Sequence, residues 1–194
     1  MRKNLIMKLY LLLFLTTTFA FSQVKDCNYE IEEKTDSTTI KIVAEKIIYE
    51  KTFGASKKFI QFTPMQIDGT PTLKVQIVEK NTAFIPAKCF DLTSKLLFQL
   101  ENGKFVVLKS ITENTCSILN YNQEDQSNIR ILEGYFIFTK PNYEMLKISP
   151  ISIMRLQFVG EKEDYNIKNE LISEINQKAT KPSNFFIDTL KCIE

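Results

Sequence analysis

The chain has 194 residues, of which 44% are hydrophobic and 25% are charged, with 25 basic and 23 acidic side chains. It contains no histidine and no tryptophan. The lack of histidine excludes Ser-His and Cys-His nucleophile pairs and a histidine general base.

The first 22 residues have the pattern of a secretory signal peptide. A basic segment, an apolar run and a group of small residues follow one another: Arg2, Lys3 and Lys8, then 9–15, then Ala20-Phe21-Ser22. We expect cleavage before Gln23 and one domain over 23–194, exported to the periplasm or the cell exterior. The apolar run is shorter than the about 20 residues of a transmembrane span, although an uncleaved N-terminal anchor is the alternative.

Removal of this segment changes the charge balance. Three basic residues precede Gln23, so residues 23–194 carry 22 basic against 23 acidic side chains, a net charge of −1. The lysines are scattered rather than clustered, and we therefore expect no nucleic-acid partner.

The first half of this domain has strand patterns. The range 38–50 mixes alternation with a run of β-branched residues, which would also suit a short helix. Apolar runs over 59–67 and 72–80 flank Asp68-Gly69-Thr70-Pro71, a turn-forming cluster.

A second hairpin is expected around Asn102-Gly103. A two-residue type I′ turn at this pair would place Phe98 opposite Val107 and create one apolar face, made of Leu96, Phe98, Leu100, Phe105 and Val107. The other face would be polar near the turn and apolar further down, where Val106 and Leu108 lie.

Four cysteines follow the expected cleavage site, and an even number in an exported chain predicts disulfides. If the strands of the second hairpin ran on without interruption, Cys89 would face Cys116, although 91–94 would be able to break the ladder. We therefore favour the pairs Cys89–Cys116 and Cys27–Cys192, with four buried free thiols as the alternative. Without a C-x-x-C pattern or a histidine, no metal site is expected.

Further along the chain, 122–128 is predicted to be an exposed polar loop and 129–138 a strand with Gly134 as a candidate bulge. A helical turn is expected after Pro141 and before Ser149-Pro150.

A strand should then begin near Ile151. Arg155 in this strand is a weak binding candidate, because it could clamp an anion or carboxylate on the outer face of the sheet. We favour the alternative, in which its stem covers apolar neighbours and its head pairs with a nearby Glu.

The end of the chain changes to a helical period. Asp164 is a candidate N-cap, and apolar residues recur every four positions at Ile167, Leu171 and Ile175, which predicts an amphipathic helix over 165–178. After Pro182 a second helical face contains Phe186, Leu190 and Ile193. We expect a mainly β (α+β) fold, an antiparallel sheet or sandwich with one or two helices packed on it from a helical segment at about 164–193.

Three segments resemble uncharacterised families of small exported proteins from Bacteroidetes-type bacteria: E-x-L-K-x-S-P-I-x-x-M-R over 144–155, LENGK over 100–104 and FFIDTLKCI over 185–193. The FAFSQ segment at 19–23 and the bias toward Lys, Ile, Asn and Phe are similar too. The resemblance implies an exported location and implies no activity or functional residue.

The acidic residues are spread as on a solvated surface, and no phosphate- or dinucleotide-binding motif occurs. We therefore expect no cofactor and no enzymatic activity, with a glycosidase-type carboxylate pair as the alternative. Two functions fit such a chain. The one we favour is a protein-interaction or envelope-associated module that uses exposed apolar side chains such as Val106 and Leu108. The other is a carrier in which a curved sheet and C-terminal helices enclose a Phe- and Ile-lined pocket for an apolar ligand or lipid.

Overall fold

The computed structural model describes residues 27–194, so the expected signal peptide and its cleavage before Gln23 lie outside the described residues. The strands are β1 (Tyr29–Lys34), β2 (Thr39–Val43), β3 (Lys46–Phe53), β4 (Ser56–Ile67), β5 (Thr70–Asn81), β6 (Cys89–Phe90), β7 (Lys95–Leu100), β8 (Phe105–Ser110), β9 (Thr115–Cys116), β10 (Ile118–Asn122), β11 (Ser127–Ile137), β12 (Ile151–Gln157), β13 (Lys162–Asn166), β14 (Leu171–Ile172) and β15 (Ala179–Thr180). The helices are α2 (Lys140–Ile148) and α3 (Phe185–Thr189), and the 3-10 turns η1 (Pro182–Asn184) and η2 (Leu190–Ile193) flank α3.

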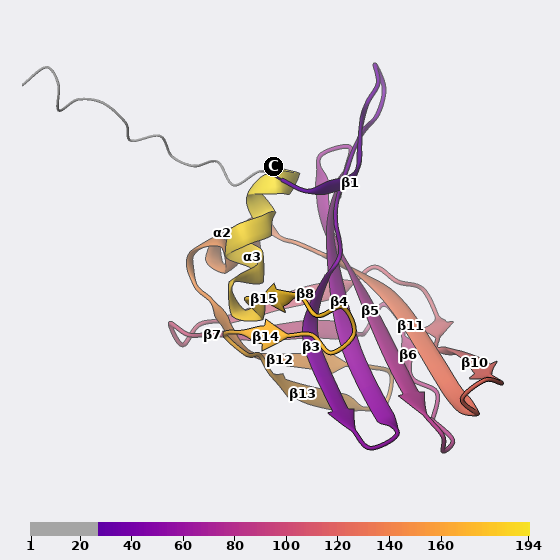
Figure 1. Ribbon diagram of the computed structural model, residues 1–194. Coiled ribbons are helices and arrows are strands. Elements are labelled where there is room, and N and C mark those ends of the chain that lie inside the picture. Colours follow the sequence, from indigo (N-terminus) through magenta and orange to yellow (C-terminus); the bar gives the residue numbers. More distant parts are fainter. Residues whose placement is uncertain (1–26) are drawn as a thin grey trace, which may run out of the picture.

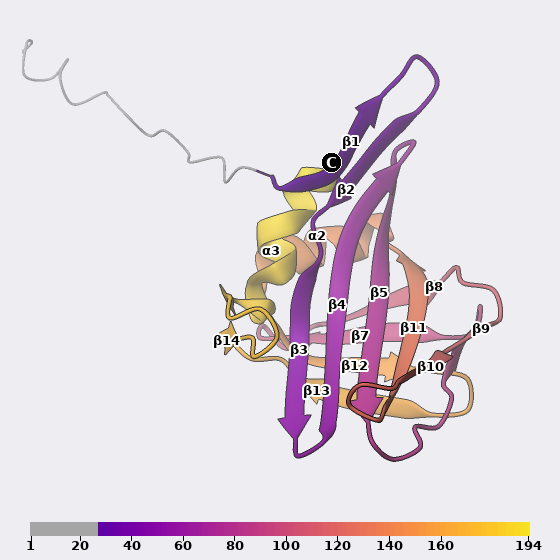
Figure 2. The ribbon, with the colours of Figure 1, turned by 45° about the vertical axis from the view of Figure 1, so that its right-hand side comes forward.

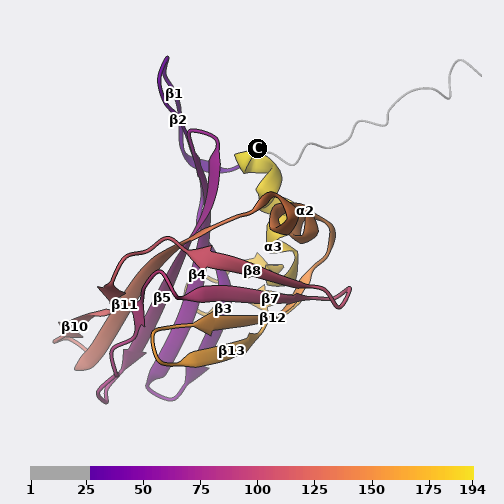
Figure 3. The same ribbon diagram turned by 180° about the vertical axis from the view of Figure 1, so that it is seen from behind.

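One antiparallel sheet folds over to make two layers. Its strand order is β1-β2-β4-β5-β11-β8-β7-β12-β13, with β3 beside β4 and β10 beside β11. The layer of β3, β4, β5 and β11 crosses the layer of β8, β7, β12 and β13 at a steep angle (Figures 1 and 3). Only two residue pairs join the layers through β11 and β8, Phe136 with Ser110 and Ile137 with Lys109. The fold is thus mainly β and sandwich-like, as the sequence predicts.

Phenylalanine rings fill the space between the layers. Phe186 from α3 contacts Phe98 of β7 edge to face, with ring centroids 5.0 Å apart, and lies 6.0 Å from Phe62 of β4. Figure 2 shows α3 beside β3 at one end of the sandwich. The helical face predicted after Pro182 therefore covers the core at this end of the sandwich, and its Leu190 and Ile193 are also buried.

The first hairpin has the expected position. The predicted runs 59–67 and 72–80 lie within β4 and β5, and Asp68 and Gly69 connect the two strands with positive φ angles of 48° and 80°. The ambiguous range 38–50 forms β2 and the first part of β3.

The second hairpin departs from the expected register by one residue. Phe98 lies opposite Val106, one residue short of its expected partner, because Gly103 is the only residue of the turn with positive φ and the connection is longer than two residues. A one-residue slip moves every side chain of a strand to the other face. Val106 and Leu108, expected at the surface, are therefore fully buried, whereas Phe105, expected in the core, is 64% exposed.

The helix expected over 165–178 is wrong. Residues 165–166 end strand β13, and β14 pairs with β15 as a small hairpin. Asp164, the expected N-cap, lies in β13 opposite Arg155 of β12. The edge of β12 pairs with Lys162–Asn166, so the first two residues of the expected helix are already part of a strand ladder.

The apolar residues of this segment do not share one face. Ile167 and Leu171 are buried, but Ile175 is half exposed in the loop between β14 and β15. A four-residue recurrence fits short strands joined by turns as well as it fits a helix. The C-terminal helical segment is therefore confined to 182–193.

The four cysteines form the favoured pairs. Cys27 is bonded to Cys192 and Cys89 to Cys116, and the described residues contain no free cysteine. Disulfides of this kind indicate an oxidising, exported environment.

The expected bulge at Gly134 is also wrong. β11 pairs with β5 through this residue without a register shift, with Gly134 opposite Val75. Strand β11 covers most of the predicted range 129–138, and α2 ends before Pro150 as predicted. No helix in residues 27–194 is long and apolar enough to cross a bilayer.

Candidate functional site

The main concave site is a pocket of about 440 Å³ between β3 and residues 170–188, which we call the β3 pocket. Its apolar walls are formed by Ile47, Ile48, Leu171, Ile172, Pro182 and Phe185. Small-molecule sites in proteins have volumes of roughly 300–1,000 Å³ and predominantly apolar walls, so the β3 pocket is large enough for a small ligand.

An irregularity in β3 creates one wall of this pocket. The pairing of β3 with β4 shifts register between Ile47 and Tyr49, and an extra residue of this kind re-aims side chains. Ile47 and Ile48 are both buried although they are adjacent in the strand, where neighbouring side chains ordinarily point to opposite faces.

The β14–β15 hairpin forms the opposite wall and is bonded to β3. The Ser173 hydroxyl donates a hydrogen bond to Glu50 Oε2 at 2.6 Å, and the Glu174 backbone N–H donates to Glu50 Oε1 at 2.9 Å. The hairpin is thus held over the strand by a carboxylate that accepts from two consecutive residues at the start of its loop.

The lining also contains charged side chains of both signs. Lys46 and Lys181 are balanced by Glu170 and Asp188. The charged part of the lining, which we call the rim, therefore has no net charge and contains both donors and acceptors.

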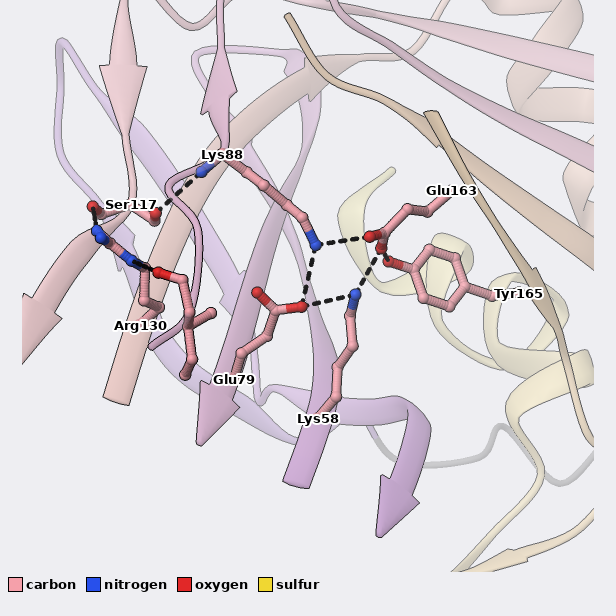
Figure 4. A network of polar contacts seen from close by, with 8 residues as sticks. Lys58, Glu79, Lys88, Ser117, Arg130, Glu163 and Tyr165 are labelled. Carbon is pink, nitrogen blue, oxygen red and sulfur yellow. Dashed lines mark hydrogen bonds and ion pairs between the residues drawn. The ribbon is translucent and has the colours of Figure 1, made fainter. Parts of the chain in front are cut away.

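Apart from the pocket, a cluster of charged side chains joins the two layers (Figure 4). It lies between β4 and β13, which are not paired by backbone hydrogen bonds. Lys58 contacts Glu79 at 2.8 Å and Glu163 at 2.5 Å. Lys88 contacts the same two carboxylates at 3.0 and 2.6 Å. We call these four residues with Tyr165 the charge square.

The charge square shifts the pKa values of its members. Burial raises the pKa of Glu163, but the hydrogen bonds from Lys58, Lys88 and Tyr165 outweigh burial and lower it to about 2. Burial lowers the pKa of Lys88, yet its bonds to Glu163 and Glu79 raise it overall. The pKa of Tyr165 is raised by burial and by its hydrogen bond to Glu163. Opposite neighbours thus favour the ionised forms of Glu163 and Lys88.

Carboxylates with shifted pKa values can mark catalytic sites, but the contacts of the charge square are those of a structural ion-pair network. Both oxygens of Glu163 accept hydrogen bonds, from Lys88 on one and from Lys58 and Tyr165 on the other. Tyr165 also meets Tyr49 of β3 edge to face at 4.8 Å. The cluster therefore links β13 to the other layer by side chains in place of backbone bonds.

The binding candidate Arg155 lies on the outer face of the layer of β8, β7, β12 and β13. Its guanidinium donates to both oxygens of Asp164, with Nε–Oδ1 at 2.5 Å and Nη2–Oδ2 at 2.6 Å. The fork is thus engaged by a carboxylate of the protein, an aspartate rather than the glutamate that the sequence suggested.

Sequence patterns missed the β3 pocket, since Glu170, Leu171 and Ile172 of its lining fall in the segment expected to be helical. Two residues of the charge square had a signal. The Asp68-Gly69 turn, extended back along both strands, places Lys58 directly opposite Glu79. Lys88 and Glu163 come from a loop and from a distant strand, and no local pattern connects them.

Among residues 27–194, no group of three or more Cys, Asp or Glu side chains could hold a metal ion. Comparisons of the chain with protein-family models, with curated proteins and with solved structures find no match.

Proposed function

We propose that the protein is a non-enzymatic, envelope-associated binding module of the periplasm or cell exterior, and that the β3 pocket holds the apolar part of a small amphipathic ligand. The observation that carries the proposal is the pocket itself, with apolar walls of about the right volume and a rim of balanced charge. The space between the layers is filled by aromatic rings, so the ligand would sit beside the sandwich and not inside it.

The rim favours one class of polar head. Two basic and two acidic side chains in the lining can face a zwitterionic head with matching signs, whereas a purely anionic or cationic head would meet two like charges. We therefore expect a zwitterionic amphiphile to bind more tightly than a charged one with the same chain.

The absence of tryptophan from the chain permits a clean fluorescence test. Ile172, at the pocket, and Ile148, at the end of α2, are each 70% exposed. Ile172→Trp should therefore report on the pocket, and Ile148→Trp is a matched control. The probes are decylphosphocholine, undecanoate and decyltrimethylammonium, which share a ten-carbon alkyl chain and are used below their micellar concentrations.

We expect a saturable shift of tryptophan emission to shorter wavelength in Ile172→Trp alone, at the lowest concentration for the zwitterion. A shift that does not saturate, or one that is equal in the two variants, would refute the ligand site. Native mass spectrometry of protein purified without detergent then checks for a natural ligand, seen as extra mass that is lost on denaturation.

A second candidate, contact with another protein, is favoured by a different observation. Strand β10 leaves large apolar side chains exposed at an edge of the sheet, with Ile118 at 67% and Tyr121 at 59%. Val106 and Leu108 are buried and cannot serve as this surface.

A further inference from the structure

Strand β10 is an uncharged edge of the sheet. It pairs with β11 on one side, and no strand among residues 27–194 pairs with its other side. Its sequence, Ile-Leu-Asn-Tyr-Asn, has no charged residue. By contrast, the edge strands β1 and β13 have the sequences YEIEEK and KEDYN. Charges on edge strands prevent pairing with other chains, and β10 lacks this protection.

A row of apolar residues on the outer face of the layer of β3, β4, β5 and β11 ends at this edge. In register, Phe59 of β4 lies opposite Val78 of β5, Val78 opposite Ile131 of β11, and Ile131 opposite Ile118 of β10. Figure 1 shows β10 beyond β11 at the border of the layer. Residues directly opposite on one face stabilise a sheet by side-chain contact, and Ile118 has such a neighbour on one side only.

The strand is also held in an extended conformation before any partner arrives. The bond between Cys89 and Cys116 ends two residues before Ile118. Ser117, which lies between Cys116 and Ile118, donates its N–H to the Lys88 carbonyl at 2.8 Å. Its carbonyl accepts from Arg130 Nη1 at 2.9 Å (Figure 4). Preorganisation of this kind lowers the entropy cost of association.

We propose that two copies of this chain associate by antiparallel pairing of their β10 strands. A two-fold axis through Asn120 overlaps all five residues and sets Leu119 opposite Tyr121 of the second copy. Ile118 then lies opposite Asn122 of the second copy, which covers its open side although the apolar row itself ends at Ile118. No like charges meet in this register. Each chain has a net charge of only −1 after residue 22, so the copies repel each other weakly. The inference deepens the protein-contact candidate and does not depend on a ligand in the β3 pocket.

The dimer should be weak. Five residues from each copy bury less than the roughly 1,200–2,000 Å² of standard stable interfaces. We therefore expect a dissociation constant on the order of 10–100 μM.

Sedimentation of the disulfide-intact protein over a concentration series tests the proposal. Ile118→Lys puts a charge on the edge at a position that is 67% exposed, and Tyr121→Lys does so at one that is 59% exposed. Ile148→Lys is the matched control, the same substitution at 70% exposure on α2. We expect wild type and Ile148→Lys to change from monomer to dimer as the concentration rises. In Ile118→Lys and Tyr121→Lys the dissociation constant of the dimer should rise at least tenfold.

A wild-type protein that stays monomeric to millimolar concentration would overturn the proposal, and so would a dimer that persists in Ile118→Lys and Tyr121→Lys. Thermal unfolding of each variant confirms that the fold is intact. Tryptophan emission from Ile172→Trp measures ligand binding at the β3 pocket separately, so failure of the dimer and failure of the ligand site give different results.

Discussion

The ring of Phe90 lies so close to Gly134 that a β-carbon on residue 134 would meet its Cδ2 atom at 2.5 Å. The ring cannot easily move, because it stacks on Phe158 with centroids 5.1 Å apart and meets Phe136 edge to face at 5.4 Å. Gly134 is thus required by a neighbouring side chain, and the sheet runs through it without a bulge.

Gly134→Ala should lower the free energy of unfolding by roughly 1–3 kcal/mol, the usual cost of overpacking a core. Urea denaturation of Gly134→Ala, Phe90→Leu and the double variant measures the effect. We expect the loss from alanine to shrink when Phe90 is shortened, since the two residues are in contact. Strictly additive losses would contradict the contact.

The two disulfides should differ in their contribution to stability. Replacement of both Cys27 and Cys192 by Ala should lower the free energy of unfolding by roughly 5 kcal/mol, and replacement of Cys89 and Cys116 by roughly 3.5 kcal/mol, because the chain-entropy relation scales with the loop closed. The sequence separations are 165 and 27 residues. Guanidinium denaturation of the two double variants checks the order, and a larger loss for the short loop would argue against loop closure as the cause.

The charge square should make the fold sensitive to acid. The pKa of Glu163 is about 2 in the folded protein, below its ordinary value of 4.5. A group whose folded-state pKa is lowered stabilises the fold above its unfolded pKa and loses this contribution as pH falls through the folded pKa. The free energy of unfolding of the wild type should therefore fall as pH is lowered from about 5 to 2. Glu163→Gln should have a lower free energy of unfolding at pH 7, and this value should change less over the same pH range.

Urea midpoints measured from pH 7 to pH 2 give this comparison. Asp164→Asn is the control, since Asp164 is the next residue in β13 and is half exposed, where solvent screens its pair with Arg155. A Glu163→Gln profile parallel to wild type would show that the charge square does not contribute.

The pair of Arg155 and Asp164 should be nearly neutral for stability. Its geometry is bidentate, but the two side chains are 42% and 51% exposed. Exposed ion pairs contribute about 0.2–1 kcal/mol. A double-mutant cycle with Arg155→Ala and Asp164→Ala should give a coupling energy within that range and a smaller one in 1 M salt. A coupling above about 2 kcal/mol would contradict this expectation.

Turn chemistry explains both the correct and the incorrect register in the sequence analysis. At Asp68-Gly69 both residues adopt positive φ, as a two-residue turn needs. At Asn102-Gly103 only the glycine does, and Asn102 instead accepts a hydrogen bond from the Lys104 N–H at 3.0 Å. A glycine with positive φ occurs in both the two-residue turn and the longer turn, so an Asp-Gly or Asn-Gly pair alone does not show which of the two turns forms.

The register of a two-residue turn predicts the pairing of Cys89 with Cys116 correctly, although β7 and β8 are shifted by one residue from that register. The interruption at 91–94, where Asp91 accepts from Thr93 and Ser94, absorbs the difference. The fold class was therefore predictable from alternation and turn residues. The β3 pocket and the charge square were not, because they depend on how the two layers and the last 25 or so residues come together, as in any site built from distant segments.

The bond between Cys27 and Cys192 gives the molecule an unusual response to mechanical tension. The Tyr29 hydroxyl also donates to the Cys192 carbonyl at 2.8 Å, so a hydrogen bond next to the disulfide holds the same two segments together. A pull applied on the chain before Cys27 and after Cys192 would travel through the sulfur–sulfur link, and the 165-residue span that it encloses would bear no load. The sandwich is thereby insulated from any tether that acts through both of these segments.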